Sequence, residues 1–234
     1  MGLVAVLLDW GGTLTPQHRV DLLPLWLAAA RVLSPDDPAP LARALLEAEA
    51  ESWARCTATL RSATLDEVLR SAATTAGVNV PEELIAEAMD AHLQGFERYT
   101  RAEPEAPAVL RRLRGMGLRT GMLSNTHWPR EWHERFLVRD GLADLIDVRR
   151  YTSELAHIKP HPEAFRAALD GLGVTDPATV AMVGDRPIDD IDGAHALGMR
   201  TVWRRNHGVP AGRSQPEAVI TELRELAPVL TRWV

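Results

Sequence analysis

The sequence predicts a doubly wound (Rossmann-like) α/β fold, in which an inserted all-helical cap domain interrupts a core built on a parallel sheet. Short apolar runs bounded by turn residues recur along the chain and alternate with helical patterns. Between residues 16 and 100 the strand patterns stop and amphipathic helical patterns follow one another. A length of 234 residues is enough for one domain that carries a smaller inserted one.

Four apolar runs predict the strands of the sheet. They cover residues 3–8, 119–123, 179–183 and 200–203. None of them shows the alternation of a half-solvated antiparallel strand, so we expect each to be buried on both faces of a parallel sheet. Helical patterns lie between them, at residues 106–116, 162–172 and 189–197, and glycines stand where these helices are expected to end.

The segment between the first two strands predicts helices only. The patterns cover residues 22–33, 41–60, 65–76 and 81–99, and a run of prolines at positions 35, 38 and 40 separates the first from the second. We therefore expect a core domain of residues 1–15 and 101–234 and a helical cap domain of residues 16–100. Because open α/β folds bind ligands at the C-terminal edge of the sheet, the cap is expected to cover that edge.

Composition excludes several classes of protein. Apolar residues make up 46% and charged residues 25%, as in ordinary globular chains, and the net charge of −6 offers no basic face for nucleic acid. The apolar run at the start is too short to span a membrane and lacks the basic flank of a signal peptide. Cys56 is the single cysteine, which fits a reducing compartment. We expect a cytoplasmic protein without a membrane or nucleic-acid partner. The sequence does not determine whether the protein is a monomer or an oligomer.

Almost all of the basic residues are arginine, with one exception. Lys159 is the single lysine among 26 lysine and arginine residues. A compact ammonium and a planar guanidinium are not interchangeable where geometry matters. The survival of one lysine therefore marks position 159 as a site that requires an ammonium group.

Polar residues follow the predicted strands at four places. The stretch "DWGGTLT" begins with Asp9 at the end of the first strand, and Ser124 ends another in "MLSNT". Lys159 precedes a predicted helix in "HIKPHPEAF", and Asp185 follows a strand in "VGDRPIDD". Because the ends of parallel strands meet at one edge of a sheet, these four side chains are expected to converge.

These motifs resemble the four signatures of the haloacid dehalogenase-like (HAD) hydrolase superfamily. That family has Asp-x-x-Gly-Thr, a strand-end Ser or Thr, a Lys, and Gly-Asp followed by a further Asp, in this order. The resemblance covers the whole chain, and the helical insertion has the position and size of the superfamily's cap.

The resemblance implies a role for each motif residue. Asp9 is the expected nucleophile, which forms an aspartyl-phosphate, and Thr13 and Ser124 are expected to bind the transferred group. Lys159 would lie between Asp9 and the acidic cluster and neutralise charge there. The expected Mg²⁺ ligands are oxygen atoms, and the candidates are Asp9, the carbonyl of Gly11, Asp185, Asp189 and Asp190.

Two of these assignments stay open, and further residues are candidates for binding the substrate. One of Asp189 and Asp190 is expected to bind the metal through water and the other to support Lys159. Candidates for contacts with a small phosphorylated substrate are Trp10, Gly12, Asn125, His127 and Arg61.

Gly11 departs from the pattern of most phosphatases in the superfamily. They carry an aspartate at this position, which protonates the leaving group and later activates water, and such help is typically worth roughly 10²–10⁴-fold in rate. The 2-haloacid dehalogenases also lack this acid, but they lack the Gly-Asp metal motif that is present here. The expected function is a Mg²⁺-dependent phosphatase or phosphotransferase, with His18 or His127 as possible substitutes for the acid. The alternatives are a binding or regulatory module without turnover and a 2-haloacid dehalogenase-like enzyme.

Overall fold

The computed structural model describes residues 2–234, so residue 1 of the predicted core lies outside the described residues. Over this range the chain forms a parallel six-stranded sheet in the order β3-β2-β1-β4-β5-β6. The strands are β1 (Ala5–Leu8), β2 (Arg119–Ser124), β3 (Val148–Tyr151), β4 (Val180–Gly184), β5 (Arg200–Arg204) and β6 (Ala218–Ile220). This is the doubly wound strand order, in which the direction of winding reverses between β1 and β4.

Two layers of helices cover the sheet because alternate residues of each strand point to opposite faces. On one face, Val6 and Leu8 of β1 belong to the same buried cluster as α5 (Ala106–Gly115), α6 (Arg130–Arg139) and α9 (Leu226–Leu230). On the other face, Ala5 and Leu7 pack with α7 (Pro162–Gly171) and α8 (Gly193–Ala196). The predicted α/β class is confirmed, and β1 is buried along its whole length.

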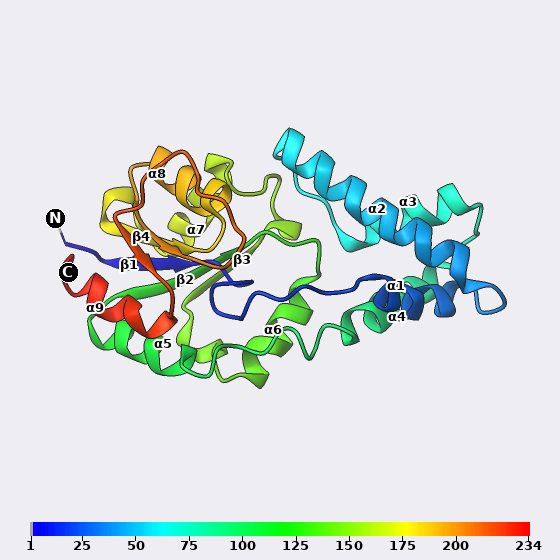
Figure 1. The fold of residues 1–234 in the computed structure, drawn as a ribbon, viewed down its shortest axis with the longest axis horizontal. Helices are drawn as coiled ribbons and strands as arrows, with labels where there is room; N and C mark the ends of the chain where they lie inside the picture. Colours follow the sequence, from blue (N-terminus) through cyan, green and yellow to red (C-terminus); the bar gives the residue numbers. More distant parts are fainter. Residues whose placement is uncertain (1) are drawn as a thin grey trace.

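The helices between β1 and α5 pack with one another beyond one end of the sheet. They are α1 (Leu23–Leu33), α2 (Pro38–Thr59), α3 (Leu65–Ala76) and α4 (Glu82–Gln94). Figure 1 shows these four helices gathered on the right, away from the two chain ends on the left. Helix α3 matches its predicted limits, and its start is fixed by a capping box between Thr64 and Glu67. The domain limits expected from the sequence stay a prediction.

The sequence patterns missed two strands and two α-helices and misjudged the limits of others. Strands β3 and β6 were not predicted because they lie at the edges of the sheet and are only partly buried, and helices α6 and α9 were also missed. The helix expected over residues 81–99 ends at Gln94. Helix α2 begins at Pro38, so Pro38 and Pro40 lie in its first turn, where a missing N–H costs nothing, and do not separate two helices. The helix predicted over residues 189–197 is instead a π-helical turn, Pro187–Asp192, followed by the short α8.

Candidate active site

The predicted nucleophile lies where the direction of winding reverses. Asp9 directly follows β1, and Asp185 directly follows the neighbouring strand β4. Both carboxylates are almost completely buried, at 6% and 1% exposure. The pairing of β1 with β4 therefore brings together two acids that are 176 positions apart in the chain, as predicted from the convergence of strand ends.

Lys159 links Asp9 to the acidic cluster. Its Nζ donates to Oδ1 of Asp9 at 2.6 Å and to Oδ1 of Asp190 at 2.7 Å. Burial alone lowers the pKa of Lys159, but the carboxylates of Asp190 and Asp9 outweigh it and hold the pKa above its usual range. The ammonium is therefore charged at neutral pH and is held between two carboxylates.

The backbone on both sides of Lys159 is held in place as well. The side-chain amide of Asn125 donates to the carbonyl of Lys159 at 3.0 Å, and the Lys159 N–H donates to Oδ1 of Asn125 at 2.8 Å. Segment 156–158 pairs with the end of α2, through Ile158 N–H to Leu60 O and Ser62 N–H to Ala156 O, each at 3.1 Å. These contacts attach the lysine loop to both the sheet and the helical insertion.

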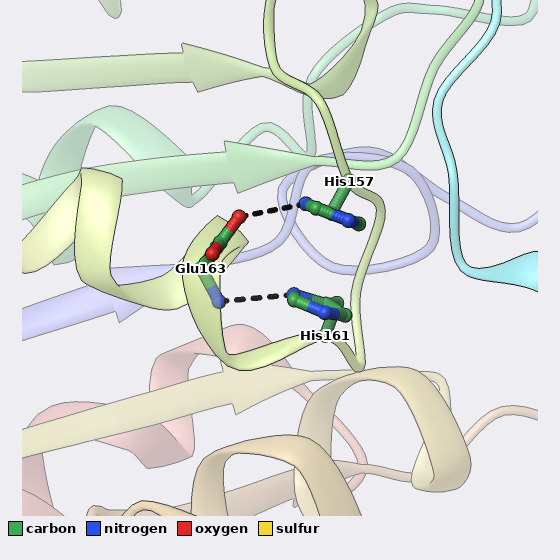
Figure 2. A group of neighbouring side chains, drawn as sticks. All are labelled: His157, His161 and Glu163. Atoms are coloured by element: carbon green, nitrogen blue, oxygen red, sulfur yellow. Dashed lines mark hydrogen bonds and ion pairs between the residues drawn. The ribbon is translucent and has the colours of Figure 1, made fainter.

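Two histidines and a glutamate brace the other end of this loop, where α7 begins (Figure 2). His157 Nδ1 lies 2.8 Å from Oε2 of Glu163, and the Glu163 N–H donates to Nδ1 of His161 at 3.3 Å. The two imidazole rings stack with their centroids 3.7 Å apart. Because Glu163 already engages both Nδ1 atoms, we interpret this group as a cap for α7 that helps to position Lys159.

The carboxylates outnumber the positive charge in this site. Oxygen atoms of Asp9, Asp185 and Asp190 lie within 4.8 Å of one another, and Lys159 is the ammonium among them. Burial, together with the nearby Asp9 carboxylate, raises the pKa of Asp185 to about 6. Oδ2 of Asp185 accepts from Asn206 at 3.0 Å, whereas its buried Oδ1 has no partner among residues 2–234. A hard divalent cation with oxygen ligands fits this arrangement, since it would occupy the free oxygen and balance the excess negative charge.

Asp189 and Asp190 occupy different surroundings. Both oxygens of Asp190 are engaged, one by Lys159 and the other by the Arg186 N–H at 2.9 Å. The side chain of Asp189 lines the cavity described below and has no hydrogen-bond partner within the described chain. Although an oxygen of Asp190 is close enough to share a cation, its existing bonds favour Asp190 as the support of Lys159 and Asp189 as a metal-site residue.

The two glycines after Asp9 differ in the space around them. Gly12 has a φ of +78°, and a Cβ there would lie 2.4 Å from Oδ2 of Asp185. A side chain is therefore excluded at Gly12 both by conformation and by contact. Gly11 is exposed, and a Cβ there would meet nothing within 4 Å. The absent acid at position 11 thus does not result from crowding.

A cavity of about 550 Å³ opens beside Asp9. Residues from both the sheet and the helical insertion line it, and among them are the predicted site residues Trp10, Gly11, Ser124, Asn125, His127, Lys159 and Asp189. Thr13 is fully buried nearby, and its hydroxyl has no partner among the described residues. Arg61 does not line this cavity, and its backbone instead forms a bridge with His157.

The histidines expected to replace the missing acid both line this cavity. His127 stacks on Trp53 with 4.0 Å between ring centroids, and its Nε2 lies 3.7 Å from Sγ of Cys56. Burial lowers the pKa of His127 to about 4, so it is neutral at pH 7 and has no proton to give as an imidazolium. His18 is exposed and packs edge-on against Tyr99. Of the two, His18 is the one that water reaches.

Sequence reasoning missed two residues that shape the site. Asn206, which follows β5, donates to the carbonyl of Gly12 at 2.9 Å and to Asp185, so it ties the turn after Asp9 to the acid after β4. Its position just after a predicted strand is a signal that could have identified it. His133 also lines the cavity, but it belongs to α6, which had no predicted pattern.

Comparisons with known proteins agree with this fold and identify the family. The model of the haloacid dehalogenase-like hydrolase family matches residues 3–198, so the chain belongs to this family of hydrolases. Over 139 residues it is 34% identical to the glyceraldehyde 3-phosphate phosphatase of Pyrococcus furiosus, covering 57% of this chain and 56% of that one. Over 124 residues it is 37% identical to the phosphoserine phosphatase of Thermus thermophilus, covering 53% and 49%. The chain thus spans about half the length of the curated relatives it matches.

Solved structures match over almost the entire chain. The 2-haloacid dehalogenase of Pseudomonas syringae pv. Tomato aligns with a TM-score of 0.70 and 28% identity, covering 99% of this chain and 100% of that one. A HAD phosphatase from Thermococcus onnurineus aligns with a TM-score of 0.64 at 24% identity, covering 97% and 98%, and it supports the fold alone. Within the part of the chain that the structure describes, none of the helices has the length and apolar character to cross a membrane.

Proposed function

We propose that the protein is a Mg²⁺-dependent phosphatase or phosphotransferase that acts on a small phosphorylated metabolite through an aspartyl-phosphate on Asp9. The observation that carries the proposal is the free, buried Oδ1 of Asp185 in a cluster of three carboxylates that share one ammonium. The phosphatases among the relatives support the same chemistry.

The geometry supports a division of labour between the two oxygens of Asp9. Oδ1 accepts from Lys159, which leaves Oδ2 to attack phosphorus at the cavity. The new O–P bond forms as the bond to the leaving group breaks, and the leaving group departs with the electron pair. Water then attacks the aspartyl-phosphate and releases inorganic phosphate. Lys159 offsets the charge of the nucleophile, while Thr13 and Ser124 donate hydroxyl groups to the phosphoryl oxygens.

The metal would be held by Asp9, Asp185, Asp189 and the carbonyl of Gly11. When bound, Mg²⁺ screens the repulsion between an anionic nucleophile and an anionic phosphate. Asp190 would act through Lys159, as its two existing hydrogen bonds imply.

The test is hydrolysis of acetyl phosphate, a substrate whose leaving group needs little help from an acid. We expect phosphate release that requires Mg²⁺, is abolished by EDTA and disappears in Asp9→Asn. Asp170→Asn, an exposed aspartate at the end of α7, is the matched control and is expected to keep full activity. Equal activity of Asp9→Asn and wild type would contradict the proposal.

A second candidate, 2-haloacid dehalogenation, is favoured by the glycine at position 11 and by the likeness to the Pseudomonas syringae enzyme. Displacement of halide by Asp9 needs no proton on the leaving group. The presence of Asp185 argues against dehalogenation. Displacement of halide by Asp9 has no step that requires the additional carboxylate of Asp185. Release of chloride from 2-chloropropionate in the presence of EDTA would establish this activity. If neither reaction occurs but Mg²⁺ and tungstate still bind, the chain is a binding module.

A further inference from the structure

The cavity beside Asp9 has two chemically different ends. The nucleophile end carries Asp9, Lys159, Asp189 and Arg186. The remaining wall is mixed. Four aromatic and three aliphatic side chains line it, and they are Trp10, Trp53, Phe96, Trp128, Val20, Leu22 and Ile158. Hydrogen-bonding side chains lie among them, including Glu49, Thr57, Thr126, His18, His127 and His133. The part of a substrate that lies beyond the phosphate therefore meets aromatic rings together with hydrogen-bonding groups.

The aromatic side chains are fixed by contact with one another. Trp128 packs edge-on against Trp10 with centroids 6.0 Å apart, and it packs at a tilt against Phe96 with centroids 4.6 Å apart. Trp53 reaches the cavity from α2 and stacks on His127, which follows β2. Rigid rings from both the sheet and the insertion form a preorganised surface for a flat apolar group.

The insertion supplies no lysine or arginine to the part of this wall that the structure describes. Over the described residues, the lysine and arginine side chains that line the cavity are Lys159 and Arg186, and both belong to the nucleophile end. The insertion contributes Glu49 instead, which is buried and accepts from the indole N–H of Trp26 at 2.7 Å. A carboxylate or a second phosphate on the organic part of a substrate would meet no lysine or arginine of the insertion there and would face the Glu49 side chain, so that part is expected to be uncharged.

The glycine at position 11 also favours a substrate with an aromatic leaving group. Without an acid at the leaving oxygen, the rate depends on how well the leaving group carries negative charge. A phenol has a pKa of about 10, far below that of an alcohol, so a phenolate leaves with much less help from a proton donor.

From the aromatic wall, the absent cation and the absent acid together, we infer that the substrate is an aryl phosphate, the phosphate monoester of an uncharged aromatic hydroxyl compound. The inference rests on the proposed phosphatase function. In the reaction, Oδ2 of Asp9 bonds to phosphorus, the bond between phosphorus and the aryl oxygen breaks, and the phenolate leaves with its electron pair and takes a proton from water.

The first experiment compares kcat/KM for phenyl phosphate and 1-naphthyl phosphate with kcat/KM for phosphoglycolate, using the full chain with Mg²⁺. We expect both aryl phosphates to exceed phosphoglycolate by at least about tenfold, since the latter carries a carboxylate and an alkoxide leaving group. Hydrolysis of acetyl phosphate distinguishes a failure of the proposed substrate class from a failure of the proposed function. If Asp9-dependent hydrolysis of acetyl phosphate occurs without a preference for aryl phosphates, the substrate class is wrong and the proposed function stands. If acetyl phosphate is not hydrolysed, the proposed function fails and the substrate class fails with it.

The second experiment tests the aromatic wall by substitution. In Trp53→Leu and, separately, Phe96→Leu, the ratio of kcat/KM for 1-naphthyl phosphate to that for acetyl phosphate is expected to fall about 3- to 10-fold, the usual scale of one lost aromatic contact. Trp233→Leu, which replaces a partly exposed tryptophan remote from the cavity, is the matched control. A calorimetric titration with phenylphosphonate, compared with methylphosphonate, gives the same ratio without turnover. An unchanged ratio in both cavity variants would overturn the inference.

Discussion

The ammonium nitrogen of Lys159 lies 2.7 Å from Oδ1 of Asp190, and neither side chain is more than 1% exposed. The second oxygen of Asp190 accepts the Arg186 N–H, so each oxygen of this carboxylate already has one hydrogen-bond partner. This relationship separates two adjacent aspartates that the sequence left as alternatives. Asp190 is part of a buried ion pair, whereas Asp189 is not.

Substitution of the two aspartates is therefore expected to have different effects. Asp190→Asn removes one of the two carboxylate partners of Lys159 and should lower the free energy of unfolding by about 1–3 kcal/mol, because Asp9 still pairs with the ammonium. Asp189→Asn removes no hydrogen bond seen in residues 2–234 and should change stability by no more than about 0.5 kcal/mol. It should instead raise the Mg²⁺ concentration needed for half-maximal activity. Urea denaturation and Mg²⁺ titration measure the two effects, and equal destabilisation by both variants would contradict the assignment.

Lys159→Arg is expected to inactivate the protein although it preserves the charge. The planar guanidinium is larger than an ammonium and cannot take its place between Asp9 and Asp190 without displacing one of them. Because misplacement of a reacting group by about 1 Å can cost roughly 10²-fold in rate, we expect a loss of at least that size with acetyl phosphate. The matched control is Arg166→Lys on the exposed side of α7, which should keep its rate. A Lys159→Arg variant of near-normal activity would show that no compact ammonium is needed.

Gly11→Asp is expected to fold and to broaden the range of leaving groups. A Cβ at position 11 meets no neighbour, so the side chain fits, and it would supply the acid that other phosphatases of the family carry. If proton transfer limits the rate, kcat/KM for an alkyl phosphate such as phosphoglycolate should rise roughly 10²-fold or more, with less gain for acetyl phosphate.

Gly12→Ala is the contrasting variant. A Cβ there would collide with the Asp185 carboxylate on a backbone of positive φ, so stability and activity should both fall. Thermal unfolding and phosphate release measured on both variants test the pair. If Gly11→Asp folds normally and the alkyl phosphate rate stays unchanged, the shape of the cavity limits the reaction and not the missing acid.

His92 is expected to make stability dependent on pH. It is fully buried in α4, stacked on Trp26 at 3.6 Å between centroids, and burial lowers its pKa to about 3. Between that value and the ordinary histidine pKa of about 6.5, the unfolded chain binds a proton that the folded chain does not. This histidine therefore makes stability rise with pH across the window, and the contribution is lost as the pH falls below about 6.5.

His92→Phe removes this titration and keeps an aromatic ring beside Trp26. Below pH 6 the wild type should lose stability relative to the variant by up to about 1.4 kcal/mol per pH unit. Urea denaturation at pH 7, 6, 5.5 and 5 gives the difference at each pH. A difference that stays constant over this range would mean that His92 accepts a proton in the folded protein.

Part of the fold was accessible from the sequence because central parallel strands are buried on both faces and are therefore apolar throughout. Strands β1, β2, β4 and β5 were found in this way, and α3 was found through its amphipathic pattern. The edge strands β3 and β6 carry no such pattern, since each has a neighbour on one side only. Helix α6 was missed, and with it His133 on the cavity wall.

The sequence by itself determined the family and the order of the motif residues along the chain. It could do so because these residues lie in short local patterns that follow predicted strands. The opening stretch contains both the expected nucleophile, Asp9, and the glycine where an acid is absent. The tertiary structure alone showed which of the two aspartates bonds to Lys159, that Arg61 lies off the cavity, and that aromatic rings from separate segments line it. The physical reason is that these properties depend on contacts between segments far apart in the sequence, which no local pattern of residues records.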